Sequence, residues 1–210
     1  MIKELKFPII YNKNIKTGYG GNQEWFGQNW KRQAGCGSTS GANLVAYYAT
    51  VDTSLAKLYK GNSISFNQIE YVQVMDEMFT YMKPNIFGYP YIHKFSEQFV
   101  KFCGEHGVKM EARIIKKYRS TEEAFQFVKE QIDAGQPIAL LVLFHRARQL
   151  KDDNWHWMTI TGYIEDNEKN ITQIIRSNYG KREIVDAKVL FEIHNRNIVR
   201  MASFHIINEN

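Results

Sequence analysis

The chain has 210 residues, of which 44% are hydrophobic and 14% aromatic, and its formal net charge is +5. This hydrophobic content matches globular proteins and excludes a disordered chain, and the length suffices for a core. We therefore expect one domain over residues 1–210. The positive charge comes from scattered Lys and Arg without a continuous basic run, so we expect no nucleic-acid partner.

Two cysteines, Cys36 and Cys103, exclude a disulfide-rich scaffold, while a single bridge between them stays open. Cys103 lies in a helical stretch and is expected to be a buried structural thiol. Because cysteines are few and no two histidines have helical ligand spacing, we expect no metal and no cofactor. The sequence shows no signal-peptide pattern and no long apolar run, which favours a cytoplasmic protein without a membrane partner, or an exported one whose leader was removed.

Residues 1–35 are expected to be an irregular segment, because glycines there stand among Asn, Gln and Trp residues. Further along, apolar residues recur at three- and four-residue steps, and two capping boxes mark helix starts. We predict helices, in chain order, over Ser38–Val51, Asn67–Met82, Lys94–Glu105 and Ser120–Gly135.

Strand patterns dominate the second half of the chain. They cover Val108–Ile115, Pro137–Phe144, Trp155–Ile164, Ile171–Ile175, Glu183–Val185 and Ile198–Ile207, with a helical turn over Ala187–Ile193. Helices come mostly first and strands mostly last. This segregation predicts an α+β fold in which a helical N-terminal half packs on a C-terminal antiparallel sheet.

Cys36 lies between glycines at the expected start of the first helix, in Gln33-Ala-Gly-Cys-Gly-Ser-Thr-Ser-Gly-Ala-Asn43. A helix N-terminus carries partial positive charge and unpaired N–H groups. Both stabilise a thiolate, so the pattern predicts a nucleophile that is active near neutral pH. Such a cysteine needs a histidine as general base, which Asn or Asp in turn holds in place.

His156 is the best candidate among the six histidines, because it begins a predicted strand directly after a polar loop. A ring in that position is held on a rigid element at the rim of a cleft. His145, at the end of another predicted strand, is the fallback base or a substrate contact.

The group that orients the histidine is expected near the end of the Ile171–Ile175 strand. Asn178 can accept a hydrogen bond from an imidazole N–H and so fix its tautomer. Ser177 is an alternative, and Glu165 and Asp166 are further candidates if their loop folds back.

Together, Cys-Gly-Ser-Thr-Ser-Gly-Ala-Asn (36–43), His-Trp-Met-Thr-Ile-Thr-Gly-Tyr (156–163) and Ser-Asn-Tyr-Gly-Lys (177–181) resemble the papain-like cysteine peptidase superfamily. The resemblance is closest to its bacterial branch, which includes bacteriocin-leader peptidases. It implies a papain-like fold, with Cys36 as nucleophile, His156 as general base and acid, and Asn178 as the orienting residue. Ser38 and Tyr179 depart from the usual proline and tryptophan.

Two points of register follow from this resemblance. If the chain is aligned on plant-type papains, Gln33 becomes the oxyanion glutamine and Thr39 takes the position of the nucleophile, which would make the protein an inactive homologue. We prefer the alignment with Cys36 as nucleophile, because the small-residue helix follows it. For the oxyanion hole we expect the Cys36 N–H and the side chain of Gln28. Three tryptophans are expected to shield the site or pack in the core: Trp25, Trp30 and Trp155.

The sequence thus predicts a cysteine peptidase that hydrolyses peptide or isopeptide amides of a peptide or protein substrate through an acyl-enzyme. Two alternatives stay open. One is an acyltransferase of transglutaminase type with the same triad, and the other is a non-catalytic peptide-binding homologue. Oligomeric state and cleavage specificity cannot be read from the sequence.

Overall fold

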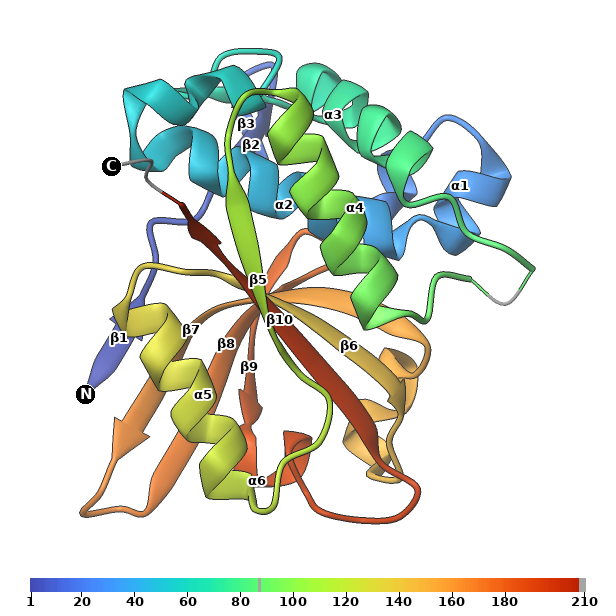
Figure 1. Cartoon of the computed structure of the whole chain (residues 1–210). Coiled ribbons are helices and arrows are strands. Elements are labelled where there is room, and N and C mark those ends of the chain that lie inside the picture. Colours follow the sequence, from blue (N-terminus) through green and yellow to red (C-terminus); the bar gives the residue numbers. More distant parts are fainter. Residues whose placement is uncertain (87, 208–210) are drawn as a thin grey trace.

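A computed structural model describes residues 1–86 and 88–207, and Figure 1 shows helices α1–α4 gathered above a fan of strands. The helical half contains η1 (Gln23–Trp25), α1 (Asn29–Ala34), α2 (Cys36–Val51), η2 (Thr53–Leu58), α3 (Gln68–Tyr81) and α4 (Ile92–Glu105). The large sheet follows mostly later in the chain. The predicted α+β class, in which a helical N-terminal half packs on a C-terminal antiparallel sheet, is confirmed in this layout.

The large sheet is antiparallel throughout. Its strands, in spatial order, are β5 (Met110–Ile115), β10 (Ile198–Ile206), β6 (Ile138–Phe144), β7 (His156–Asp166), β8 (Ile171–Asn178) and β9 (Lys181–Asp186). A seventh strand, β1 (Ile2–Glu4), pairs with the part of β7 that β6 does not reach. The first residues of the chain thereby complete the sheet.

Strand β6 is apolar along almost its whole length because both of its faces are covered. Leu141 and Leu143 pack into the core shared with α2 and α4. Leu140 and Val142 belong to a second core beneath α5 (Thr121–Asp133) and α6 (Ala187–Leu190). Burying each of these side chains contributes about 1.5–3 kcal/mol, so β6 joins the two layers of helices through the sheet.

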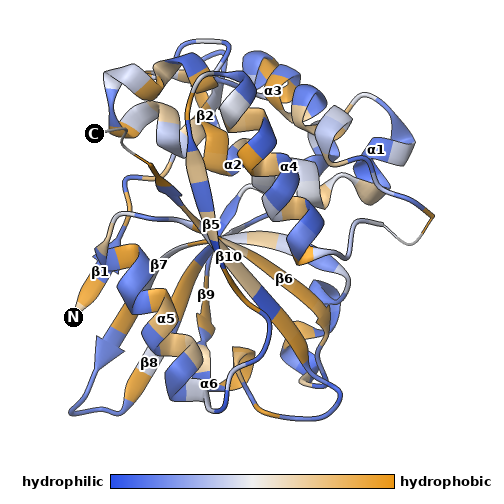
Figure 2. Cartoon of the chain, in the orientation of Figure 1, coloured by the Kyte–Doolittle hydropathy of each residue, from blue (hydrophilic) through white to orange (hydrophobic). Residues whose placement is uncertain are grey.

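Helix α2 is the central helix, and Figure 2 shows it flanked by the other helices of this half. Its residues 36–49 are all buried, as expected for a helix covered on every side. Gly41 permits the close approach of α3, because a Cβ there would lie 2.7 Å from Met78 Cγ. The helix also packs on β7, and this contact brings its first residue next to the sheet.

Most predicted elements are present with shifted ends. The caps expected at Asn67 and Ser120 form, since their side chains accept hydrogen bonds from the N–H groups of Ile69 and Glu123. Cys103 is buried on α4, and both cysteines are free. None of the described helices is long and apolar enough to cross a membrane.

Residues 1–35 differ from the expected irregular segment. Besides β1, η1 and α1, they contain β2 (Ile9–Asn12) and β3 (Ile15–Tyr19), and β2 also pairs with the short β4 (Phe66–Asn67). Strands of three to five residues are too short for a periodic pattern to emerge. β2 and β3 pair with each other as a hairpin, whereas β1 takes its conformation from pairing with the distant β7.

Candidate active site

Cys36 is the first residue of α2, so its side chain lies at the N-terminal end of the central helix. The hydroxyls of Ser38 and Thr39 each donate to the carbonyl of Gly35 at 2.9 Å, which fixes this first turn. Thr39 lies nearly one turn further along the helix, with its hydroxyl already bonded. The structure therefore places Cys36, and not Thr39, at the helix N-terminus.

His156 is the first residue of β7, and Asn178 is the last residue of the neighbouring β8. Because the two strands are antiparallel, the start of one lies beside the end of the other. His156 Nε2 and Asn178 Oδ1 are 3.0 Å apart, and both residues are buried. Oδ1 can only accept, so Nε2 carries the proton and Nδ1 is left with a lone pair.

Tyr179 fixes the plane of the His156 ring. The two rings are stacked, with centroids 4.6 Å apart and an angle of 8° between their planes. Tyr179 and Gly180 form the two-residue turn between β8 and β9, with φ angles of 47° and 70°. A bulky residue at positive φ is uncommon and costs about 1–3 kcal/mol. The stacking on His156 gives a reason for this strained position.

Cys36 and His156 line the same small void, whose volume is about 10 Å³. This is close to the space that one water molecule needs. Most of the other residues around it come from the loop before η1, from α2 and from the β7–β8 pair. The void is lined by Gly21, Gln23, Cys36, Thr39, Ser40, Asn43, His156, Trp157, Met158, Ser177 and Tyr179.

The electrostatics of the pair differ from the expected resting thiolate. Burial raises the pKa of the Cys36 thiol, although the N–H groups of Trp157, Gly37 and Cys36 itself act in the opposite direction. Burial also lowers the pKa of His156 to about 4. Desolvation disfavours the thiolate of Cys36 and the imidazolium of His156, and at Cys36 it outweighs the stabilisation of the thiolate by the helix N-terminus. The resting pair is therefore a neutral thiol and a neutral imidazole.

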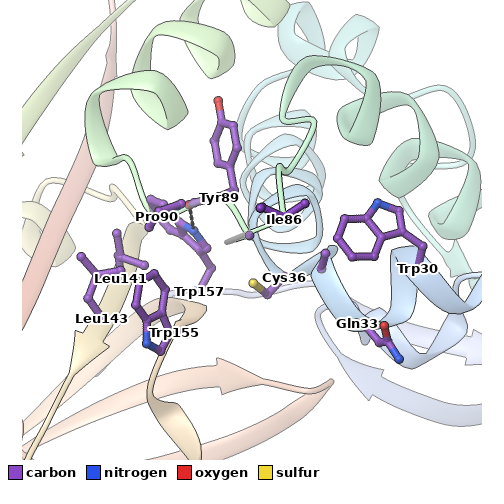
Figure 3. A pocket seen from close by; sticks show the side chains of 12 residues that line it. Trp30, Gln33, Cys36, Ile86, Tyr89, Pro90, Leu141, Leu143, Trp155 and Trp157 are labelled. Carbon is purple, nitrogen blue, oxygen red and sulfur yellow. Dashed lines mark hydrogen bonds between the residues drawn. The ribbon is translucent and has the colours of Figure 1, made fainter.

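A larger cavity of about 320 Å³ opens on the other side of Cys36. Figure 3 shows the sulfur between Trp155 and Trp157 of the sheet half and Trp30 and Gln33 of the helical half. The Trp157 indole N–H donates to the carbonyl of Tyr89 at 2.7 Å and so ties the two halves together. None of the described lining residues is charged: Trp30, Gln33, Ala34, Cys36, Ile86, Gly88, Tyr89, Pro90, Leu141, Leu143, Trp155 and Trp157.

The glutamine that shares the small void with Cys36 is Gln23 rather than Gln28, while Gln33 lines the larger cavity. Gln28 caps α1, has an exposed side chain and lines neither cavity. Gln23 is buried in η1, donates from Nε2 to the carbonyl of Arg32 at 2.6 Å, and has no partner for Oε1 among the described residues. Sequence reasoning missed it because only the folding of the 20–23 loop onto α2 brings it to the site.

That loop is held by Asn43 in the second turn of α2. Its Oδ1 accepts from the Gly21 N–H and from the Tyr71 hydroxyl, both at 2.7 Å, and its Nδ2 donates to Thr159 at 3.2 Å. The side chain thus connects the loop, α3 and β7 at one point. A buried amide with all these partners is rigid.

The other orienting candidates have other partners or lie elsewhere, and of them only Ser177 lines the small void. Ser177 donates to the carbonyl of Tyr19 at 2.6 Å. Glu165 and Asp166 lie at the opposite end of β7 from His156, and Glu165 pairs with Lys129. His145 is buried, accepts from the Ala147 N–H and lines neither cavity.

Two of the three tryptophans expected near the site, Trp30 and Trp155, line the larger cavity. Trp25 instead packs edge-on against Tyr71 in the helical half. Among the described residues, no group of three or more His, Cys, Asp and Glu could hold a metal ion.

A family model matches residues 21–184, a segment that contains Gln23, Cys36, His156 and Asn178. The chain belongs to the Peptidase C39-like family. The resemblance to cysteine peptidases seen in the three sequence motifs is confirmed at the level of this family. No curated protein sequence matches the chain.

Two solved structures are similar to this member of the Peptidase C39-like family. UfSP from C. elegans is 9% identical with a TM-score of 0.46, over 100% of this chain and 35% of that one. The Pseudomonas avirulence protein AvrPphB is 10% identical with a TM-score of 0.42, over 86% of this chain and 95% of that one. The chain thus spans about a third of the length of the UfSP chain.

Proposed function

We propose that the chain hydrolyses a peptide or isopeptide amide through a triad of Cys36, His156 and Asn178. The observation that carries this proposal is the 3.0 Å contact between His156 Nε2 and Asn178 Oδ1, in a void that Cys36 also lines. This contact leaves Nδ1 of His156 as the basic nitrogen for the thiol. A nucleophile, its base and an orienting group are thus in the order that acyl transfer requires.

In the first step the Cys36 sulfur attacks the substrate carbonyl while its proton passes to Nδ1 of His156. A neutral resting pair makes this transfer part of the attack, so His156 acts as a true general base. The tetrahedral intermediate collapses when the imidazolium returns the proton to the leaving amine. Water then attacks the thioester with His156 again as base, which releases the carboxylic acid and the free thiol.

The oxyanion is held by the backbone N–H of Cys36 and by Nε2 of Gln23. A glutamine Nε2 carries two hydrogens. The bond to Arg32 uses one and leaves the second available to an oxyanion in the void that Gln23 lines. These donors are fixed before the substrate arrives, which is the condition under which such groups lower the barrier most.

The larger cavity is the natural place for a substrate side chain next to the scissile bond. It reaches Cys36, and its described lining is uncharged and mostly aromatic or aliphatic. A charged side chain there would lose its hydration without gaining a partner. We therefore assign the substrate as a peptide with a large apolar residue beside the amide that is cleaved.

The test is hydrolysis of a peptide library by the wild-type chain and two cysteine variants. Cys36→Ala should abolish cleavage, whereas Cys103→Ala, the matched change at a buried thiol outside the site, should retain it. Mass spectrometry with and without an added amine separates hydrolysis from acyl transfer. Equal cleavage by wild type and Cys36→Ala would refute the proposal.

A further inference from the structure

Three charged side chains that the proposed mechanism does not use surround Asn178. They are Asp153, the residue that ends η3 (Arg148–Asp153), Arg176 on β8 and Glu183 on β9. Asp153 and Arg176 are 5% and 6% exposed, and Arg176 is directly opposite Glu183 in the β8–β9 register. Buried charges are costly unless they are paired. A buried charged cluster directly beside Asn178 therefore needs a physical explanation.

Arg176 holds both carboxylates in place. Its Nη1 donates to Asp153 at 2.7 Å, and its Nε and Nη2 donate to Glu183 at 3.1 and 2.9 Å. Each of the two carboxylates also accepts a hydrogen bond from the side-chain amide of Asn178. Asn178 Nδ2 donates to Glu183 at 3.0 Å and to Asp153 at 3.4 Å.

An asparagine amide has a donor end and an acceptor end, and nothing in its shape distinguishes them. Two carboxylates accept only, so they attract Nδ2 and repel Oδ1. Oδ1 must then face His156, where it can accept only from a protonated Nε2. The lone pair of the imidazole is thereby placed on Nδ1.

We propose that Glu183 and Asp153, held by Arg176, are positioning residues that set the orientation of the Asn178 amide and so select the tautomer of His156 needed for proton transfer from Cys36. This inference rests on the proposed function. It gives the carboxylates a role that acts through Asn178, without contact with the reacting atoms.

Removing Glu183 does more than free the amide. Arg176 loses the acceptor of two of its N–H groups, and Asn178 shares that acceptor. These two N–H groups, on a guanidinium that still pairs with Asp153 through Nη1, then attract Oδ1, which turns Nδ2 toward His156 and moves the imidazole proton to Nδ1. A hydrogen bond to a charged group is strong enough to shift this balance about tenfold to a hundredfold.

The experiment compares Glu183→Ala and Glu183→Gln with Glu192→Ala. Glu192 is a matched control, because it also pairs with an arginine, Arg146, through both carboxylate oxygens and also accepts from an asparagine, Asn197. It lines neither cavity at Cys36. Each variant is first shown to be folded by its thermal unfolding curve.

Two readouts are measured on the folded proteins. Long-range proton–nitrogen NMR reports which nitrogen of His156 carries the proton, and iodoacetamide reports the alkylation rate of Cys36. We expect the Nε2–H form in wild type and in Glu192→Ala. Glu183→Ala should shift His156 toward the Nδ1–H form and slow alkylation about tenfold to a hundredfold. Glu183→Gln keeps an acceptor oxygen and should recover most of the rate.

Asn178→Asp separates positioning from simple pairing. If His156 only needed an acceptor, Asp would serve at this position. In Asn178→Asp, however, the oxygen that replaces Nδ2 would face the carboxylates of Glu183 and Asp153 and repel them, so we expect slower alkylation than in wild type. The double variant Asn178→Asp with Glu183→Gln should be faster than Asn178→Asp alone, because Gln supplies an N–H.

The NMR readout keeps this inference separate from the proposed function. Equal peptide cleavage by wild type and Cys36→Ala would refute the mechanism, while the tautomer in Glu183→Ala would still decide the positioning role. An unchanged Nε2–H tautomer in folded Glu183→Ala would overturn the inference, even if Cys36 proves to be the nucleophile.

Discussion

The buried, neutral His156 makes the stability of the protein depend on pH in a specific direction. Its pKa is about 4 in the folded chain, against 6.5 for an ordinary histidine. Because the folded state resists protonation, the stabilisation is complete above about pH 6.5 and is lost as the pH falls toward 4. The gap of about 2.5 between the two pKa values corresponds to about 3 kcal/mol.

The perturbation that isolates this effect is His156→Gln, which removes the titrating group and leaves a neutral side chain. Between about pH 7.5 and pH 5, wild type should lose about 2 kcal/mol more unfolding free energy than His156→Gln. Urea unfolding followed by circular dichroism at several pH values measures this difference. His93→Gln, at an exposed histidine on α4, is the matched control and should follow wild type.

The opposite pH dependence would refute the neutral state of His156. If wild type gained stability relative to His156→Gln as the pH fell, the pKa of His156 would be raised rather than lowered. That is the behaviour of an imidazolium paired with a resting thiolate. A pH-independent difference between the two proteins would equally contradict the neutral pair.

Two further predictions concern the substrate side of the site. Gln23→Ala should lower kcat about 10²–10³-fold, because an oxyanion donor is lost. Gln28→Ala is the control and should leave kcat unchanged. Equal effects of the two changes in steady-state assays would reject the assignment of Gln23. Ile86→Glu adds a charge at the rim of the larger cavity, where the side chain is 83% exposed, and should reduce cleavage beside large apolar residues about tenfold relative to cleavage beside lysine. Ile64→Glu, at an isoleucine that is 95% exposed elsewhere, should keep the wild-type preference in the same peptide library.

The sequence was informative where local rules decide the outcome. The caps at Asn67 and Ser120 and the apolar run of β6 follow from short-range chemistry and from complete burial. Cys36, the proposed nucleophile, was visible for the same reason, because a cysteine among glycines before an apolar helix is a local pattern. His156 was visible as a polar residue at the start of a strand.

Other features depended on contacts between distant segments. Strand β1 forms because it pairs with β7, and the local β2–β3 hairpin is joined to the helical half because β2 pairs with β4. Gln23 reaches the void only because Asn43 holds the preceding loop, so the glutamine expected from spacing, Gln28, lies elsewhere. The spacing between a glutamine and a cysteine does not determine how the intervening chain turns.

The sequence by itself thus determined the α+β class, the helix that carries Cys36 and the strand that begins with His156, because periodicity, capping and glycine placement act over a few residues. The protonation of Cys36 and His156 and the orientation of Asn178 depend instead on tertiary contacts. Burial sets the first, and the carboxylates of Asp153 and Glu183 set the second. Both depend on groups that come together only when the helical half closes on the sheet and β7, β8 and β9 pair.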